Sequence, residues 1–355
     1  MLKFLRWLLY PFSVIYDLIT RMRNYLFDHG ILKSVSFDKP VICIGNITVG
    51  GTGKTPHTEY IAKLLLPDFK VFMISRGYKR SSAGVVIANS NSNAGDIGDE
   101  PFQMKSKFQD LSVIVAEKRV EGINESLKLS PPPDIILLDD AFQHRHVNPG
   151  LNILLVDYTR PVWKDLTFPA GNMRESWSSY KRADIIIITK CPSTFTDFQR
   201  DRILKKFKHF SSENIYFSGF KYGNPYSLVQ QNEKISIDHE MSVLLVTGIA
   251  NPKPLVNYLL QLTPHLTKLE FPDHHQFSNK DVLNISNKFS QLNGDNKILI
   301  TTEKDAVRLR EVNLLSNSIV EKTYIIPVEV QFFFSQETKF NNQIFEYVRN
   351  YHFNQ

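Results

Sequence analysis

Residues 41 to 56, VICIGNITVGGTGKTP, decide the fold of this chain. The apolar residues that open this stretch predict a short buried strand, and the glycines after it predict a tight loop that leads into a helix. This order is typical of the phosphate-binding loop of nucleotide-binding domains, which reads G-x-x-x-x-G-K-[ST]. The chain departs from that pattern at one position, because Thr48 stands where the first glycine belongs.

The residues of the loop suit the binding of nucleotide phosphates. Gly50, Gly51 and Gly53 allow the backbone to turn tightly and to point its N–H groups at phosphate oxygens. The side chain of Lys54 can reach the β- and γ-phosphates, and the hydroxyl of Thr55 can ligate Mg²⁺. The alternative is a chance cluster of glycines, which the predicted strand and helix on either side disfavour.

Apolar runs recur after the loop and predict a doubly wound α/β domain. They read KVFMISRGY, LSVIVAEKR, PDIILLDDAFQH, LNILLVDYTR and ADIIIITKCP. Continuous runs of Ile, Leu and Val are typical of parallel strands that are buried on both faces. We therefore predict an α/β/α sandwich of the P-loop type, whose ligands bind at the carboxyl ends of the strands.

The pattern changes twice along the chain and predicts four segments. An amphipathic N-terminal helix takes residues 1–35, the P-loop domain 36–212, a β-type connector 213–238, and a second, smaller α/β domain 239–355. The connector is rich in glycines and polar turns and shows no helical spacing. We expect it to connect the two domains.

Composition and charge limit the function classes only loosely. Hydrophobic residues make up 42% of the chain and charged residues 22%, as in a globular protein. The formal net charge of +6 suits an anionic partner without specifying one. Cys43 and Cys191 lie far apart, which argues against a disulfide framework or a zinc site and favours a reducing compartment.

The N-terminal segment MLKFLRWLLYPFSVIYDLITRMRNYLF mixes large apolar residues with Lys and Arg. Its longest uncharged run, Trp7 to Tyr16, contains Pro11 and is too short to span a bilayer. No small-residue cleavage site follows, so a secretory signal is not expected. Two interpretations stay open: a helix that lies in the lipid headgroup region, or a helix that packs on the body of the protein.

Acidic residues stand where predicted strands end. Asp139 and Asp140 close the run DIILL, which is the position of a Walker B acid that holds Mg²⁺. A helix cap or a surface turn is the alternative. Asp99 and Glu100 belong to the short sequence GDEP, which the residues alone identify only as a polar turn.

Two further motifs lie in the C-terminal segment. In FPDHHQF, Asp273 precedes His274 and His275, so a carboxylate stands beside imidazoles that could accept a proton. A solvated histidine pair is the alternative, and capture of one metal ion by both histidines is not expected, since adjacent side chains of extended backbone point opposite ways. In TTEKDAVRL, Lys304 and Asp305 predict a second strand-end site, for phosphate or for structural pairing.

Taken in order, these motifs resemble those of the tetraacyldisaccharide 4′-kinases, the membrane-associated lipid A 4′-kinases of Gram-negative bacteria. Between about residues 40 and 310 the shared motifs are VICIGNITVGGTGKTP, SRGY, GDEP, EKR, DDAFQH, FPAGNMRES, TGIANP, FPDHHQF and TTEKDAVRL. Thr48 is part of that family's own loop. Ala141 and the pair Asn172-Met173 depart from the family's usual Gly and Pro-Leu, which puts only local loop geometry in doubt.

The resemblance implies transfer of the γ-phosphate of ATP, with Mg²⁺, to the 4′-hydroxyl of an acylated disaccharide 1-phosphate lipid. It implies two α/β domains around a cleft, joined by a β-type hinge. It also implies a peripheral protein on the cytoplasmic face of the inner membrane, which its N-terminal helix contacts. We expect a monomer that binds no nucleic acid. The implied base for the sugar hydroxyl is Asp99 together with His274; because they belong to different predicted domains, domain closure would assemble the site.

The resemblance also assigns ligand contacts, which we list by ligand. ATP is expected at Thr48, Gly50, Gly51, Thr52, Gly53, Lys54 and Thr55. Mg²⁺ is expected at Thr55, Glu100, Asp139 and Asp140, and the lipid substrate at Asn46, Arg76, Arg119, His144 and Arg174.

Two other function classes stay open on the sequence. One is a P-loop GTPase or metallochaperone-type NTPase, since ITKCP echoes a guanine-reading N/T-K-x-D motif but has Pro192 in place of the Asp. The other is a membrane-tethered ATP switch that recruits partners. Nucleotide preference and the presence of a phosphorylated lipid product would separate these from a lipid kinase.

Overall fold

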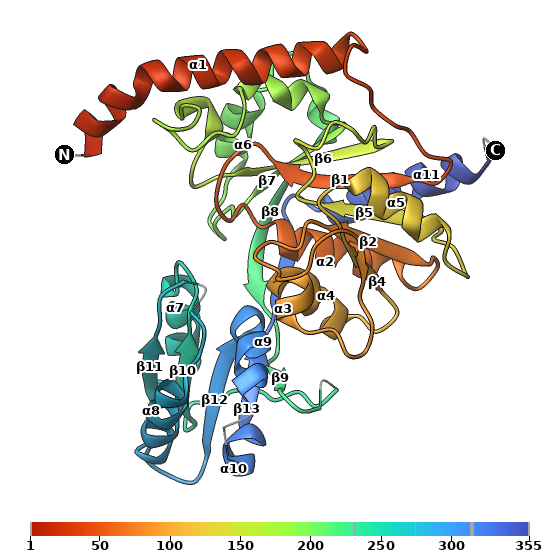
Figure 1. The fold of residues 1–355 in the computed structure, drawn as a ribbon. Helices are drawn as coiled ribbons and strands as arrows, with labels where there is room; N and C mark the ends of the chain where they lie inside the picture. Colours follow the sequence, from red (N-terminus) through yellow and green to blue (C-terminus); the bar gives the residue numbers. More distant parts are fainter. Residues whose placement is uncertain (1, 231, 274, 313–315, 354–355) are drawn as a thin grey trace. The chain divides into compact units, whose positions relative to one another are not determined.

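Figure 1 shows the fold in a computed structural model, which describes residues 2–230, 232–273, 275–312 and 316–353. The chain forms two compact units. Unit 1 contains Met1–Phe220 and Val330–Gln355, and unit 2 contains Lys221–Glu329. Each unit is built around its own sheet, and we describe the two separately.

Within the described residues, the sheet of unit 1 has nine strands in the order β14-β8-β7-β6-β1-β5-β2-β4-β3. Strands β1, β2, β4, β5, β6, β7 and β8 run parallel to one another, and β3 is antiparallel to β4. The bounds are β1 Val41–Asn46, β2 Val71–Ser75, β3 Val86–Ile87, β4 Ser112–Val115, β5 Ile135–Asp139, β6 Leu151–Asp157, β7 Ile185–Thr189, β8 Ile215–Tyr222 and β14 Val328–Phe332.

The register of these strands positions the phosphate loop. Ile44 of β1 lies opposite Asp139, the last residue of β5. On the other side of β1, Asn46 lies opposite Leu155 of β6. Since parallel strands end at the same edge, the loop after β1 and the acidic residues after β5 meet there.

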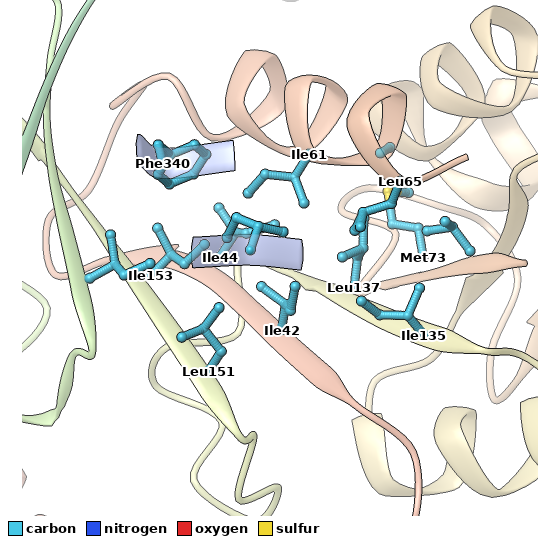
Figure 2. Packing of buried hydrophobic residues seen from close by; sticks show 14 of the residues in the cluster. Ile42, Ile44, Ile61, Leu65, Met73, Ile135, Leu137, Leu151, Ile153 and Phe340 are labelled. Carbon is cyan, nitrogen blue, oxygen red and sulfur yellow. The ribbon is translucent and has the colours of Figure 1, made fainter. Parts of the chain in front are cut away.

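Helices cover both faces of this sheet, as the continuous apolar runs predict. On one face, Ile42 and Ile44 of β1 pack with Ile61 of α2 and Phe340 of α11, as Figure 2 shows. Cys43 alternates with them and packs in a second cluster that includes residues of α5. The helices of unit 1 are α1 Leu2–Asp28, α2 Lys54–Leu65, α3 Ala94–Ile97, α4 Asp99–Lys107, α5 Arg119–Leu127, α6 Asp197–Leu204 and α11 Glu337–Phe353.

Unit 2 has a smaller α/β fold. Its sheet runs in the order β11-β10-β12-β13-β9, with β11, β10, β12 and β13 parallel and β9 antiparallel to β13. The strands are β9 Tyr226–Ser227, β10 Ser242–Thr247, β11 Leu266–Glu270, β12 Lys297–Thr302 and β13 Thr323–Ile326. The helices are α7 Lys253–Leu262, α8 Asn279–Ser290, α9 Glu303–Val312 and α10 Asn317–Val320.

The predicted fold class is confirmed: a P-loop α/β sandwich, a second and smaller α/β unit, and an N-terminal helix. The compact units differ from the predicted segments at their ends. Residues 330–355, expected in the C-terminal segment, belong to unit 1, because Phe340, Ile344 and Val348 of α11 are fully buried in its core. Part of the expected connector is β8, which pairs with β7.

Candidate active site

The phosphate loop between β1 and α2 is held by side chains from the strands around it. Gly50 and Gly53 have φ angles of 93° and 90°, a region that favours glycine. Asn46 Nδ2 donates to Thr52 Oγ1 at 2.8 Å, and Thr189 Oγ1 donates to the carbonyl of Thr52 at 2.7 Å. Asn46, expected to contact the lipid substrate, is therefore fully buried beneath the loop and supports it.

A second support comes from the loop that carries FPAGNMRES. Thr48 forms an isolated antiparallel bridge with Met173. The N–H of Val49 donates to Asn172 O at 2.7 Å, and the N–H of Arg174 donates to Ile47 O at 2.7 Å. At the position of the missing glycine, the chain is thus paired with a neighbouring segment through its backbone.

Two cationic side chains from two other motifs meet at Asp140. Lys54 Nζ lies 3.6 Å from Asp140 Oδ1, and Arg174 Nη1 lies 2.9 Å from the same oxygen. Asp140 has a φ angle of 46°, a left-handed conformation that costs a non-glycine residue on the order of 1 kcal/mol. Such strained residues cluster at functional sites, and here the turn places the carboxylate beside the phosphate-binding lysine.

Asp139 lies deeper than its neighbour. Its carboxylate is buried and accepts from Thr58 Oγ1 at 3.2 Å and Ser75 Oγ at 3.4 Å. Burial, together with the nearby charges of Glu100 and Asp140, raises the pKa of Asp139 well above its usual range. A cation bound at this place would favour the ionised carboxylate and lower that pKa again.

The residues expected to hold Mg²⁺ fit that ion by their chemistry. Thr55, Glu100, Asp139 and Asp140 offer hard oxygen ligands, and the pKa of Asp139 responds to the charge of Glu100. No group of three or more His, Cys, Asp or Glu is placed to hold a metal ion within the part of the chain that the structure describes. Mg²⁺ usually takes one or two carboxylates and completes its shell with waters and substrate phosphates.

Arg119 and His144, expected to contact the substrate, lie together behind the end of β5. Arg119 is 3% exposed and donates to Ala116 O at 2.8 Å and Asp139 O at 3.3 Å. Its backbone N–H donates to His144 Nε2 at 3.2 Å. Burial and the charge of Arg119 lower the pKa of His144 to about 4, so the imidazole is neutral near pH 7. Both side chains thus stabilise the end of β5.

The SRGY and GDEP loops contact each other directly. A Cβ on Gly98 would lie 3.2 Å from Gly77 Cα, and one on Gly77 would lie 2.8 Å from Ile97 O. Arg76, expected at the substrate, is exposed next to this contact. Asp99 begins α4, so the proposed catalytic carboxylate stands at a helix N-terminus in unit 1.

In unit 2, the motifs TGIANP and TTEKDAVRL meet at the buried carboxylate of Asp305. Its Oδ2 accepts from Gly248 N at 3.0 Å, Thr247 Oγ1 at 3.2 Å and Thr302 Oγ1 at 2.7 Å. Arg308 Nη1 lies 3.4 Å from its other oxygen, and both side chains are buried. Of the two roles expected for Asp305, the geometry favours structural pairing.

His274 lies outside the described residues. Its neighbour His275 stacks on Phe271, with ring centroids 4.7 Å apart, and its Nε2 lies 3.0 Å from Asp281 Oδ2. Since Asp281 also caps the start of α8 through Ser278, the His275 ring is fixed by its surroundings.

Residues at the ends of β6 and β7 were not assigned to the site from the sequence. Lys190 Nζ donates to the carbonyl of Gly51 and, at 2.8 Å, to Asp157 Oδ2. Arg160 lies beside Gly50. The available signal was their position directly after apolar runs, in DYTR and ITK, at the edge where ligands of α/β sheets bind.

Comparisons with known proteins identify the family. The family model described as LpxK, tetraacyldisaccharide-1-P 4′-kinase, matches residues 5–349. The tetraacyldisaccharide 4′-kinase of Bacteroides thetaiotaomicron is 45% identical over 98% of this chain and 94% of its own length. That of Flavobacterium johnsoniae is 43% identical and covers 98% of both.

A solved structure extends the likeness to the fold. The crystal structure of LpxK from Aquifex aeolicus in complex with ATP superimposes with a TM-score of 0.74 and 30% identity, and the match covers 97% of this chain and 99% of that one. The match does not favour a GTPase, a metallochaperone-type NTPase or a membrane-tethered switch. By sequence, fold and the order of its motifs, the chain belongs to the LpxK family of tetraacyldisaccharide 4′-kinases.

Proposed function

We propose that this protein transfers the γ-phosphate of ATP to the 4′-hydroxyl of tetraacyldisaccharide 1-phosphate, a step of lipid A biosynthesis. The observation that carries the proposal is the meeting of Lys54, Asp140 and Arg174 at the edge of the sheet, in a chain that belongs to the LpxK family. ATP as phosphate donor is supported by the similar Aquifex aeolicus LpxK, whose structure contains ATP.

Phosphoryl transfer depends mainly on positioning and on neutralising the charge of the phosphates. Lys54 and the N–H groups of residues 50–53 would hold the β- and γ-phosphates. Mg²⁺, when bound, would neutralise charge between these phosphates, and its protein ligands would be Thr55, Glu100 and one or both of Asp139 and Asp140. Arg174 would keep the Asp140 carboxylate in place through their 2.9 Å contact.

For the proton of the sugar hydroxyl, we propose a base formed by Asp99 and His274. The support is the family resemblance and the chemistry of the pair, because a carboxylate raises the basicity of an imidazole and fixes its tautomer. The choice of His274 is supported by the contacts of its neighbour: His275 is fixed by Phe271 and Asp281.

Helix α1 supports a proposed contact with the inner membrane, at its cytoplasmic face. It packs on unit 1, since Tyr16 Oη donates to Arg174 O at 2.9 Å and Arg23 Nη2 donates to Gln143 O at 2.8 Å. It also leaves large apolar side chains exposed, with Trp7 74% exposed, which supports the proposal that this helix contacts the headgroup region as well as unit 1. No helix within the described ranges is long and apolar enough to cross a membrane.

The remaining expected lipid contacts are Arg76 and Arg174. Arg76 is exposed, and Arg174 carries on its carbonyl the hydrogen bond from Tyr16 of α1. We propose that these cations face the anionic headgroup of the lipid. The lipid would then not be contacted by Asn46, Arg119 and His144, which would instead support the loop and the end of β5.

The decisive experiment is incubation of the protein with Mg²⁺, ATP and the disaccharide lipid, with the product detected by mass. We expect one phosphate to be added at the 4′ position. Lys54→Ala, Asp99→Ala and His274→Ala should each reduce product strongly, while the control His275→Ala should reduce it less. Preference for GTP, or hydrolysis without phosphorylated lipid, would contradict the proposal.

A further inference from the structure

Arg160 and Lys190 border the phosphate loop at two consecutive glycines. A Cβ added to Gly50 would lie 3.2 Å from Arg160 Nη2, 3.3 Å from Nη1 and 3.7 Å from Cζ, so the Nη edge of the guanidinium points at this position beside Gly50. Lys190 Nζ donates to the carbonyl of the next residue, Gly51. Arg160 follows β6, which pairs in parallel with β1, and Lys190 follows β7, which pairs in parallel with β6.

A buried carboxylate holds the two cations in position. Asp157, the last residue of β6, is 2% exposed. It accepts from Lys190 Nζ at 2.8 Å and, through its other oxygen, from Thr159 N at 2.9 Å and Thr159 Oγ1 at 2.6 Å. Arg160 Nη2 lies 3.5 Å from it, the longest of these contacts. The charge of Asp157 is thus compensated by Lys190 even when Arg160 turns to another partner.

Arg160 is suited to such a partner. Its side chain is 49% exposed, although its guanidinium touches the loop whose N–H groups are expected to point at phosphate oxygens. A guanidinium presents several donors in one plane and pairs well with phosphate. Glycine is favoured at position 50 by its φ angle of 93°, whereas an added Cβ would displace the exposed end of Arg160 by only a few tenths of an ångström.

We propose that Arg160 binds the phosphate chain of the nucleotide above Gly50, as a second phosphate-binding cation beside Lys54. Lys190 and Asp157 are positioning residues for Arg160 and for the loop. This inference rests on the proposed kinase function in that it takes ATP as the ligand. It adds a group from the end of β6 to a phosphate site otherwise formed by β1, its loop and α2.

The test measures nucleotide binding without lipid, so that it does not depend on turnover. Equilibrium titration of the full chain with Mg²⁺–ATP, with adenosine as the phosphate-free probe, is compared for the parent, Arg160→Gln and Arg160→Lys. The matched control is Arg200→Gln, an arginine of unit 1 that pairs with Asp197 on α6. Thermal unfolding is recorded for each variant.

We expect Arg160→Gln to weaken ATP binding about tenfold or more, as loss of one charged hydrogen-bonded contact predicts. The ATP affinity of Arg160→Lys should lie between those of Arg160→Gln and the parent, and that of Arg200→Gln should equal the parent's. The affinity of Arg160→Gln for ATP should also depend less on salt than that of the parent. Its adenosine affinity and melting temperature should match the parent.

Two results would overturn the inference. One is ATP binding by Arg160→Gln within twofold of the parent. The other is an equal loss in Arg160→Gln and Arg160→Lys with a lowered melting temperature, which would make Arg160 a brace of the loop. A parent that binds ATP in this charge-dependent way but phosphorylates no lipid would overturn only the proposed function.

Discussion

Lys54 and Arg174 share a single oxygen of Asp140, with Lys54 Nζ at 3.6 Å and Arg174 Nη1 at 2.9 Å from Oδ1. A phosphate-binding lysine and an arginine from a distant loop are therefore held by one carboxylate at the end of β5. If Asp140 acts through its charge, an uncharged side chain of the same size should not preserve activity.

Asp140→Asn tests this, because it removes the charge and keeps the size. We expect lipid phosphorylation to fall at least 100-fold, because the substitution removes both a proposed Mg²⁺ ligand and the negative charge that pairs with Lys54 and Arg174. Asn tolerates the left-handed conformation at φ 46°, so the free energy of unfolding should change little. Steady-state kinetics and chemical denaturation measure the two quantities. An active Asp140→Asn enzyme would exclude Asp140 as a functional carboxylate.

Thr48→Gly restores the general P-loop pattern and should not improve the enzyme. Thr48 is buried and bridges Met173 through its backbone, so glycine there adds freedom to the unfolded chain and should lower stability by about 1 kcal/mol. ATP affinity, measured by titration, should stay within a few-fold of the parent. A Thr48→Gly protein that is more stable or binds ATP much more tightly would show that threonine at this position weakens the loop.

Much of unit 1 could be predicted because its strands are buried on both faces and leave continuous apolar runs in the sequence. The edge where ligands bind followed from the same runs, since Asp139 ends β5, Asp140 follows it, and Lys54 begins α2 after the loop that follows β1. What the polar residues touch was harder to predict. Asn46 and Arg119 carry groups that suit a ligand, yet both are buried, and burial depends on distant segments of the chain.

The position of α11 was beyond local patterns for a related reason. The stripe of Phe340, Ile344 and Val348 predicts an amphipathic helix but does not say which sheet covers it. After unit 2, the chain returns through β14 to unit 1, where α11 packs on residues that are distant in the sequence. Local sequence patterns do not reveal such contacts.

Phe340→Ala should therefore destabilise unit 1. Phe340 is fully buried with Ile44 and Ile61, and removing a buried phenyl ring costs about 3–5 kcal/mol. The control Phe198→Ala changes a ring that is 71% exposed on α6 and should cost little. Chemical denaturation, with ATP binding as a probe of unit 1, measures both. Equal stabilities for the two variants would contradict the burial of α11.

In unit 2, Asp305→Ala should be strongly destabilising. It leaves Arg308 as a buried charge without this carboxylate and removes the acceptor for Gly248, Thr247 and Thr302. Breaking one side of a buried pair costs about 3–5 kcal/mol. The control Asp295→Ala changes an exposed aspartate of the same unit. Hydrogen exchange in β10 and β12 should rise only in Asp305→Ala. If both variants exchange alike, the Asp305 cluster is not what stabilises this sheet edge.

His57 should make the phosphate loop sensitive to acid. Its Nδ1–H donates to Gly53 O at 2.7 Å, and its Nε2 lies 2.9 Å from Ser218 Oγ, whose hydroxyl can donate to the neutral ring. Burial lowers the pKa of His57 from 6.5 to about 4. Between these values the unfolded chain binds more protons than the folded one, so stability present above pH 6.5 is lost as the pH falls toward 4, by up to about 3 kcal/mol.

His57→Gln removes this titration while keeping a side chain that can hydrogen-bond. Denaturation curves at pH 7, 6 and 5 should show a smaller loss of stability for His57→Gln than for the parent. His239→Gln, at an exposed histidine, should keep the parent's slope. The same slope in all three proteins would mean that His57 is protonated as easily in the folded chain as in the unfolded one. A flattened slope only in His57→Gln would locate this acid sensitivity at the contact between the phosphate loop and β8.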